Sequence, residues 1–253
     1  MRLTILGSGT GVPSLQRNAP GYLLQPTNGS YFLVDCGSAT LRQLEQVGVP
    51  YHRLDAVLIT HTHADHIGDL MALIHALRYF PVDGSLRTKP LYLLGPPGFI
   101  DFCQRVILSV TGRPTHFELH ILEAMASQVV CGVVVDSTAT VHSDHFHSVA
   151  WRIHADGKRV VLSGDCDDDP GLIQLAEQAD LLVLECSTLA SGKIRGHLSA
   201  DLCGRIAQQA GVKQLVLSHL YPIDGPDELR LSECQRYYQG AVTLATDYEV
   251  FEI

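Results

Sequence analysis

The hydrophobic pattern of the first eighty residues alternates short apolar runs with turn-forming residues. Apolar runs of strand length, separated by Gly, Pro and Asn, predict strands at residues 3–6, 22–25, 31–35 and 56–60. Longer stretches that mix apolar and polar positions predict helices at 39–47 and 68–78. Because three strands lie so close together at the start, we expect a sheet that begins by pairing neighbouring segments.

The rest of the chain continues the pattern. Strands are predicted at 92–94, 129–141, 149–153, 159–163, 181–184 and 214–218, and helices at 99–110, from about 170, and at 200–210. Asp156-Gly157 separates two of these strands and tolerates the positive φ angles of a tight hairpin turn. Two successive groups of strands and helices indicate two sheets with helices outside them, and no repeat or low-complexity tract divides residues 1–253, which we interpret as a single domain.

The composition is that of a globular protein, with 46% hydrophobic and 18% charged residues. Lys and Arg number 18 against 27 Asp and Glu, so the net charge of −9 argues against non-specific nucleic-acid binding through a basic surface. No apolar run has the about 20 residues of a membrane span, and the first residues are typical of a strand and not of a signal peptide. Seven scattered cysteines without a C-x-x-C pair argue against a disulfide framework, so we expect a cytoplasmic protein.

Histidine is frequent, with 13 residues, and three of these stand together directly after an apolar strand. The segment T-H-T-H-A-D-H supplies His61, His63, Asp65 and His66. Three imidazoles and a carboxylate in one turn at a strand end can point at one position, and such ligands suit zinc. A polar turn before a helix would place one capping residue there, not four ligand-type side chains. We therefore predict a metal site at this turn.

The block H-x-H-x-D-H after a strand resembles the signature of the metallo-β-lactamase superfamily. Other segments resemble its RNase Z-like branch in their order along the chain: L-G-S-G-T-G followed by P-S-L-Q-R-N at 6–18, L-V-D-C-G at 33–37 and G-P-P-G at 95–98. The resemblance implies an α/β fold, a four-layer αββα sandwich of two mixed sheets flanked by helices. It also implies a homodimer.

The resemblance implies further metal ligands at the ends of later apolar strands. Asp165 closes the strand after the Asp-Gly hairpin, where the family has an aspartate shared by two metals, and His219 matches the last metal histidine. One metal would then be held by His61, His63 and His142, the other by Asp65, His66 and His219, with Asp165 shared.

The spacing of the motifs does not by itself select the third histidine of the first metal. Residues 140–152 resemble the family's H-x-x-x-S-x-x-Y-R stretch, but counting back from its serine without a gap reaches Asp144. A two-residue insertion restores His142, which also follows directly on the apolar strand, and we prefer it over His145 and His147. Those two histidines are candidates to contact substrate instead.

Such a site implies two divalent cations, which lower the pKa of a shared water and clamp the attacking and leaving oxygens. We expect zinc, although the same ligands accept manganese or iron. Asp65 is the natural acceptor for the proton of that water. G-H-L-S-A at 196–200 resembles a segment whose histidine contacts the scissile phosphate, so His197 is the candidate electrophile and general acid. The alternative is that Ser199 caps the following helix and His197 only lies beside it.

The resemblance implies a phosphodiesterase, and the best-known reaction of the branch is tRNA 3′ endonucleolytic cleavage. Its tRNA nucleases carry a long basic arm near the third motif, whereas here His142 and Asp165 are separated by one hairpin, and Ile223 stands where an arginine often follows the last histidine. We therefore predict a small phosphodiester or single-stranded nucleic acid as substrate in preference to folded tRNA, with Arg17 as a phosphate contact and no membrane partner.

Three other functions stay open at this point. The chain could be a tRNA 3′-processing endonuclease that lacks the usual arm. It could be an ester, thioester or lactone hydrolase, because the same nucleophile attacks carbonyl carbon. It could also be a non-catalytic metal-binding sensor, which the presence of every inferred ligand type disfavours.

Overall fold

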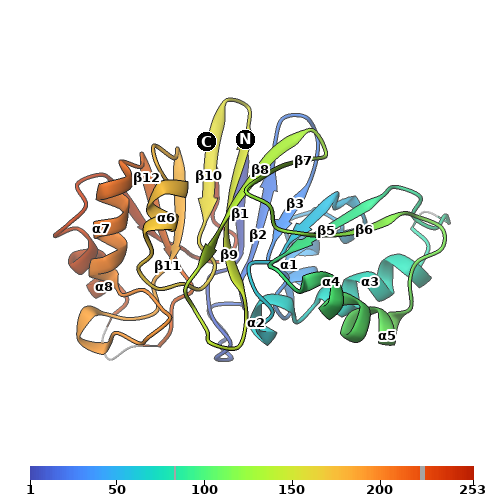
Figure 1. Ribbon diagram of the computed structural model, residues 1–253, viewed down its shortest axis with the longest axis horizontal. Helices are drawn as coiled ribbons and strands as arrows, with labels where there is room; N and C mark the ends of the chain where they lie inside the picture. Colours follow the sequence, from blue (N-terminus) through green and yellow to red (C-terminus); the bar gives the residue numbers. More distant parts are fainter. Residues whose placement is uncertain (83, 223–225) are drawn as a thin grey trace.

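The protein has the predicted αββα architecture in a computed structural model that describes residues 1–82, 84–222 and 226–253. Two seven-stranded sheets pack face to face, and helices cover the outer face of each sheet (Figure 1). The fold class predicted from the sequence is confirmed. Across the described residues no helix combines the length and the hydrophobicity needed to cross a bilayer.

The first sheet has the strand order β14-β1-β2-β3-β4-β5-β6. Its strands are β1 (Arg2–Gly7), β2 (Gly21–Gln25), β3 (Phe32–Val34), β4 (Ala56–Leu58), β5 (Leu91–Gly95), β6 (Leu119–Glu123) and β14 (Val250–Glu252). The pairs β1–β2 and β2–β3 are antiparallel, which confirms the expected local pairing, and β3 to β6 run parallel. The elements over its outer face or beside it are α1 (Thr40–Gln46), the short η1 (Tyr51–Arg53), α3 (Leu70–Tyr79), α4 (Phe99–Phe102), the π-helical η2 (Cys103–Ile107) and α5 (Leu108–Thr111).

The second sheet has the order β13-β12-β11-β10-β9-β8-β7. Its strands are β7 (Ser127–Val130), β8 (Val133–Thr140), β9 (Ser148–Ala155), β10 (Lys158–Leu162), β11 (Leu181–Glu185), β12 (Gln214–Ser218) and β13 (Ala241–Leu244). The segment from β7 to β10 is antiparallel and the segment from β10 to β13 is parallel. Its helical elements are α6 (Pro170–Leu175), η3 (Ala190–Gly192), α7 (Ala200–Ala210) and α8 (Glu228–Cys234).

The hairpin between β9 and β10 forms at the predicted dipeptide. Ala155 pairs with Lys158, so the loop has two residues, and both Asp156 (φ 57°) and Gly157 (φ 71°) adopt positive φ. These are the angles of a type I′ turn, whose twist matches that of the flanking strands. The sequence prediction is confirmed here.

Hydrogen bonds from β9 join the two sheets at the end of β4. The indole Nε1 of Trp151, a fully buried residue between the sheets, donates to the carbonyl of Ile59 at 3.2 Å. The amide of Val149 donates to the carbonyl of Thr60 at 3.0 Å. The backbone that leads into the histidine-rich turn is therefore fixed to the opposite sheet.

The elements that the hydrophobic pattern did not predict include β6, β13, β14 and α8. The three strands lie at sheet edges, and each has only one fully buried position or none. An edge strand that is half exposed needs few apolar residues, so its periodic signal is weak.

Candidate metal centre

The seven predicted metal ligands meet at one end of the sandwich. His61 and His63 follow β4, and the next turn forms α2 (Ala64–Ile67), which carries Asp65 and His66. From the second sheet come His142 after β8, Asp165 after β10 and His219 after β12. Every one of them follows the carboxyl end of a strand, so the two sheets deliver their polar residues to a common cleft.

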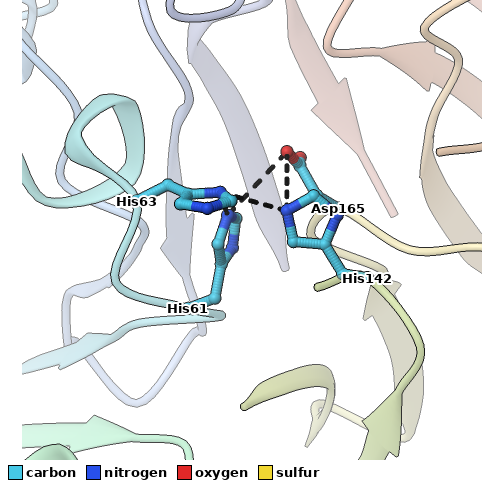
Figure 2. A group of neighbouring side chains, drawn as sticks. All are labelled: His61, His63, His142 and Asp165. Carbon is cyan, nitrogen blue, oxygen red and sulfur yellow. Dashed lines mark hydrogen bonds and ion pairs between the residues drawn. The ribbon is translucent and has the colours of Figure 1, made fainter. Parts of the chain in front are cut away.

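The first group consists of three imidazoles and one carboxylate (Figure 2). Nδ1 of His63 lies 2.9 Å from Nε2 of His61 and 3.0 Å from Nε2 of His142. Oδ2 of Asp165 lies 3.8 Å from each of those two Nε2 atoms. Nitrogen atoms from two sheets thus converge with a carboxylate oxygen on one position.

The second group uses the other oxygen of Asp165. Its Oδ1 lies 3.3 Å from Nε2 of His66 and 3.2 Å from Nε2 of His219. Oδ2 of Asp65 lies 3.7 Å and 3.5 Å from the same two nitrogens. Asp165 therefore presents one oxygen to each group of ligand atoms, as expected of a carboxylate shared between two cations.

Three polar atoms of the second group are buried and lack a hydrogen-bond partner among the described residues: Nε2 of His66, Nε2 of His219 and Oδ1 of Asp165. They are close to one another, but their alignment is not that of a hydrogen bond. A buried polar atom without a partner costs about 1–3 kcal/mol, so three around one point need a common partner. A divalent cation satisfies all three, and the imidazole and carboxylate donors are those that zinc prefers. The residues fit metal ions.

The protonation states of His61 and Asp165 suit metal binding. Burial, reinforced by the neighbouring His66, lowers the pKa of His61 well below its usual value and keeps the ring in the neutral form that binds metal. Burial alone would raise the pKa of Asp165, but the positive charges of His219 and His66 outweigh it and hold that pKa well below the usual value. Asp165 is therefore an ionised ligand. Burial alone would lower the pKa of His66, but the charges of Asp165 and Asp35 outweigh it and raise that pKa well above its usual value, so a cation bound there would displace a proton from this ring.

Outer hydrogen bonds orient the histidine rings. Nδ1 of His66 lies 2.8 Å from Oδ2 of Asp35, and Nδ1 of His142 lies 2.8 Å from the carbonyl of Gly196. Asp35 in turn accepts hydrogen bonds from the amide and the hydroxyl of Thr60. Such partners fix the tautomer and raise the basicity of a ligating histidine. The sequence predicted no role for Asp35 beyond its place in L-V-D-C-G. Like the predicted ligands, however, Asp35 directly follows a strand, here β3.

His197 stands beside both groups without belonging to either set of predicted ligands. Its ring centroid lies 4.9 Å from that of His142 and 5.9 Å from that of His219, and its Nδ1 lies 3.9 Å from Oδ2 of Asp165. Its ligand atoms are also close enough to those of Asp165 and His219 to form a third possible metal group.

Glu185, at the end of β11, is the partner of His197 that the sequence did not reveal. Its Oε1 lies 2.9 Å from Nδ1 of His197 and also accepts from the amide of Cys166, while Oε2 accepts from Ser187. Burial lowers the pKa of His197, but the hydrogen bond and the charge of Glu185 outweigh it, so the pKa lies above its usual value. The sequence did contain a signal for Glu185. It is the last residue of the apolar strand β11, and Asp165 and His219 likewise follow closely on the apolar strands β10 and β12.

The predicted substrate contacts lie outside both ligand groups. Arg17 donates to the hydroxyl of Ser8 at 2.8 Å, to the carbonyl of Ala245 at 2.5 Å and to Asp227 at 3.0 Å, so its guanidinium is held by the protein. His147 lines a cavity of about 220 Å³ next to His142, whereas His145 is exposed and lines none of the cavities described. Ile223 lies outside the described residues. The roles of these residues stay predictions.

Comparison with known proteins identifies relatives along the whole chain. The family model of the beta-lactamase superfamily domain matches residues 30–220. A ribonuclease Z of Mycobacterium bovis is 29% identical over 278 positions, covering 100% of this chain and 98% of the relative. The metallo-β-lactamase fold protein YhfI of Bacillus subtilis is 32% identical over 256 positions with 100% of both chains covered, and its crystal structure superposes with a TM-score of 0.86 over 100% of this chain and 99% of that chain. The short form of human tRNase Z is 26% identical, with a TM-score of 0.80 over 100% and 99% of the two chains.

Proposed function

This chain is a metal-dependent hydrolase of the metallo-β-lactamase superfamily, in its RNase Z-like branch, and we propose that it cleaves phosphodiester bonds. One observation carries the proposal. Nδ1 of His197 lies 2.9 Å from the buried carboxylate of Glu185 and 3.9 Å from Asp165, the carboxylate that faces both ligand groups. A cleft with two cation positions and a separate proton donor suits displacement at phosphorus, where an attacking and a leaving oxygen must both be stabilised.

Two divalent cations, zinc first among them, are the proposed cofactors. His61, His63 and His142 would hold one, Asp65, His66 and His219 the other, and Asp165 both. When bound, they would supply an activated water and positive charge for the phosphoryl oxygens. The first group combines three imidazoles with the shared carboxylate, and the second combines two imidazoles with two carboxylates. This division of the ligands supports a dinuclear site.

The chain's own residues would handle the protons. Asp65 accepts a proton from the attacking water, since its carboxylate lies beside both His66 and His219 at the second group. His197 donates its proton to the leaving oxygen as the phosphorus–oxygen bond breaks, so the alkoxide departs as an alcohol. Glu185 raises the pKa of His197 and so favours its protonated form. Because Glu185 holds Nδ1, Nε2 is the nitrogen that can face the substrate.

The proposed substrate is a small phosphodiester or a single-stranded nucleic acid. The alignment with the Mycobacterium bovis ribonuclease Z extends over 278 positions, against 253 residues in this chain, so that relative has segments that this chain lacks. The alignment with YhfI extends over only 256 positions. A net charge of −9 also leaves little basic surface for a long polyanion. Cleavage of precursor tRNA is the second candidate, because the relatives include proteins named ribonuclease Z.

The proposal is tested by hydrolysis of bis(p-nitrophenyl) phosphate with zinc- or manganese-loaded protein. We expect turnover that is abolished in His63→Ala and unchanged in His75→Ala, which removes an exposed histidine on α3. A panel that adds a precursor tRNA, an aryl ester and a lactone distinguishes the other hydrolytic functions. Full metal occupancy without phosphodiester turnover contradicts the proposal.

Localisation and assembly complete the proposal. We place the protein in the cytoplasm, because all seven cysteines are free and six of them are buried. A homodimer is proposed from the family resemblance. Sedimentation of the purified protein checks the assembly.

A further inference from the structure

A cavity of about 220 Å³ opens next to His142, on the side of the first ligand group. Two loops form it: the loop between β8 and β9, which carries His142 and Phe146, and the segment at Arg195 and Gly196 that leads to His197. The cavity thus adjoins both a metal ligand and the segment of the proposed general acid. A substituent of a substrate bound at the cations would reach it directly.

Short contacts hold the two loops together. Nδ1 of His142 lies 2.8 Å from the carbonyl of Gly196, and the amide of Gly196 donates to Asp167, whose own amide donates to the carbonyl of Val141. Gly196 has φ of 83°, and a Cβ there would lie 2.1 Å from the carbonyl oxygen of His142. Only glycine allows this approach, so the cavity is preformed in the fold.

The lining of the cavity combines an aromatic ring with a displaceable cation. Phe146 leaves 42% of its surface exposed, and its ring lies edge-on to His63 with centroids 4.9 Å apart. Arg195 pairs with Asp144 at 2.9 Å, but both side chains are largely exposed, at 82% and 71%. An exposed ion pair of this kind contributes little to stability, so a substrate group can take the place of Asp144.

We propose that this cavity is the subsite for a nucleobase of the substrate, which stacks on Phe146 while Arg195 covers its other face or edge. Exposed aromatic rings and guanidinium planes are the side chains on which unpaired bases stack. Pockets for drug-sized ligands enclose about 300–1,000 Å³, so this smaller volume suits one base rather than a paired helix. The inference rests on the proposed function and assigns its substrate class: phosphodiesters that carry an unpaired nucleoside.

The test compares two phosphodiesters that release the same leaving group, thymidine 5′-(p-nitrophenyl phosphate) and methyl p-nitrophenyl phosphate. In Phe146→Ala we expect kcat/KM for the thymidine substrate to fall about tenfold through KM, and kcat/KM for the methyl substrate to stay unchanged. Phe146→Tyr keeps the ring and is expected to retain the preference. Phe146→Leu fills space beside His63 without an aromatic face and is expected to lose it. Phe80→Ala, which removes an exposed phenylalanine beyond α3, is the matched control.

A binding measurement separates the subsite from the chemistry. Calorimetry with thymidine 5′-monophosphate and zinc-loaded protein is expected to show about tenfold weaker binding in Phe146→Ala than in wild type or Phe80→Ala. Equal losses for both substrates, or unchanged nucleotide binding, would overturn the subsite. If the wild type cleaves neither substrate when fully metal-loaded, the proposed phosphodiesterase function fails instead.

Discussion

Nδ1 of His197 lies 2.9 Å from Oε1 of Glu185, and this contact determines which of the two ring nitrogens is free. An ionised carboxylate only accepts hydrogen bonds, so Nδ1 carries a proton directed at Glu185. The Nε2 atom is then the one available to substrate. The same contact raises the pKa of His197, so one carboxylate both orients the ring and favours its protonated form.

The role of His197 as a general acid predicts a dependence on the leaving group. His197→Ala should lower kcat about 10²–10⁴-fold for a dinucleotide, whose leaving alkoxide needs a proton. For bis(p-nitrophenyl) phosphate the loss should be much smaller, because p-nitrophenolate leaves as a stable anion. Steady-state rates on both substrates check this. Equal losses would assign His197 to phosphate binding alone.

Removal of the charge on Glu185 should change the pH profile. His197 must be protonated to donate, so activity on a dinucleotide is present below its pKa and is lost as pH rises through it. Because Glu185 raises that pKa, Glu185→Gln should move the alkaline limb of kcat to lower pH. Rate profiles across neutral and alkaline pH check the shift, with Glu118→Gln, an exposed carboxylate beside β6, as control. An alkaline limb that does not move would contradict the pairing.

Asp35 should act on metal affinity more than on turnover. Asp35→Asn keeps the shape of the side chain but weakens the hydrogen bond that orients His66, so metal affinity should fall about 10–100-fold. Competition with a chromogenic chelator measures the affinity. Excess zinc should restore most of the activity of Asp35→Asn, whereas it should not rescue Asp165→Ala. If Asp35→Asn bound metal with wild-type affinity, the role of Asp35 would be limited to accepting the hydrogen bonds of Thr60.

Metal removal should lower the thermal stability of the protein. Metal at about 100 times its dissociation constant adds about 2.7 kcal/mol, which for a chain of this length corresponds to a shift in Tm of about 5–10 °C. The shift should become smaller in His66→Ala, which removes a ligand of the second cation only, and persist in full in His75→Ala. Differential scanning calorimetry with and without chelator measures it. A Tm that is independent of metal would contradict the fit of His66, His219 and Asp165 to a cation.

The sequence allowed us to predict which residues gather at the centre, because each of them follows the end of an apolar strand. His142 could be preferred over His145 because it directly follows an apolar strand, and the structure brings its Nε2 to 3.0 Å from Nδ1 of His63 while His145 is exposed. Glu185 also follows such a strand, but its pairing with His197 depends on how β11 lies beside α7, which no local pattern contains. The same holds for β14, whose partner β1 is almost the whole chain away.

The pairing of β1 with β14 has a consequence for the order of the chain. The amide of Ile253 donates to the carbonyl of Met1 at 2.9 Å, so residues 1 and 253 are neighbours, and in Figure 1 the two termini lie at the end of the sandwich opposite α2. A short linker could join them, and the chain could be reopened at the two-residue turn of Cys131 and Gly132 between β7 and β8. Such a circular permutant would start with His142, Asp165 and His219 and end with His61 to His66, yet assemble the same centre.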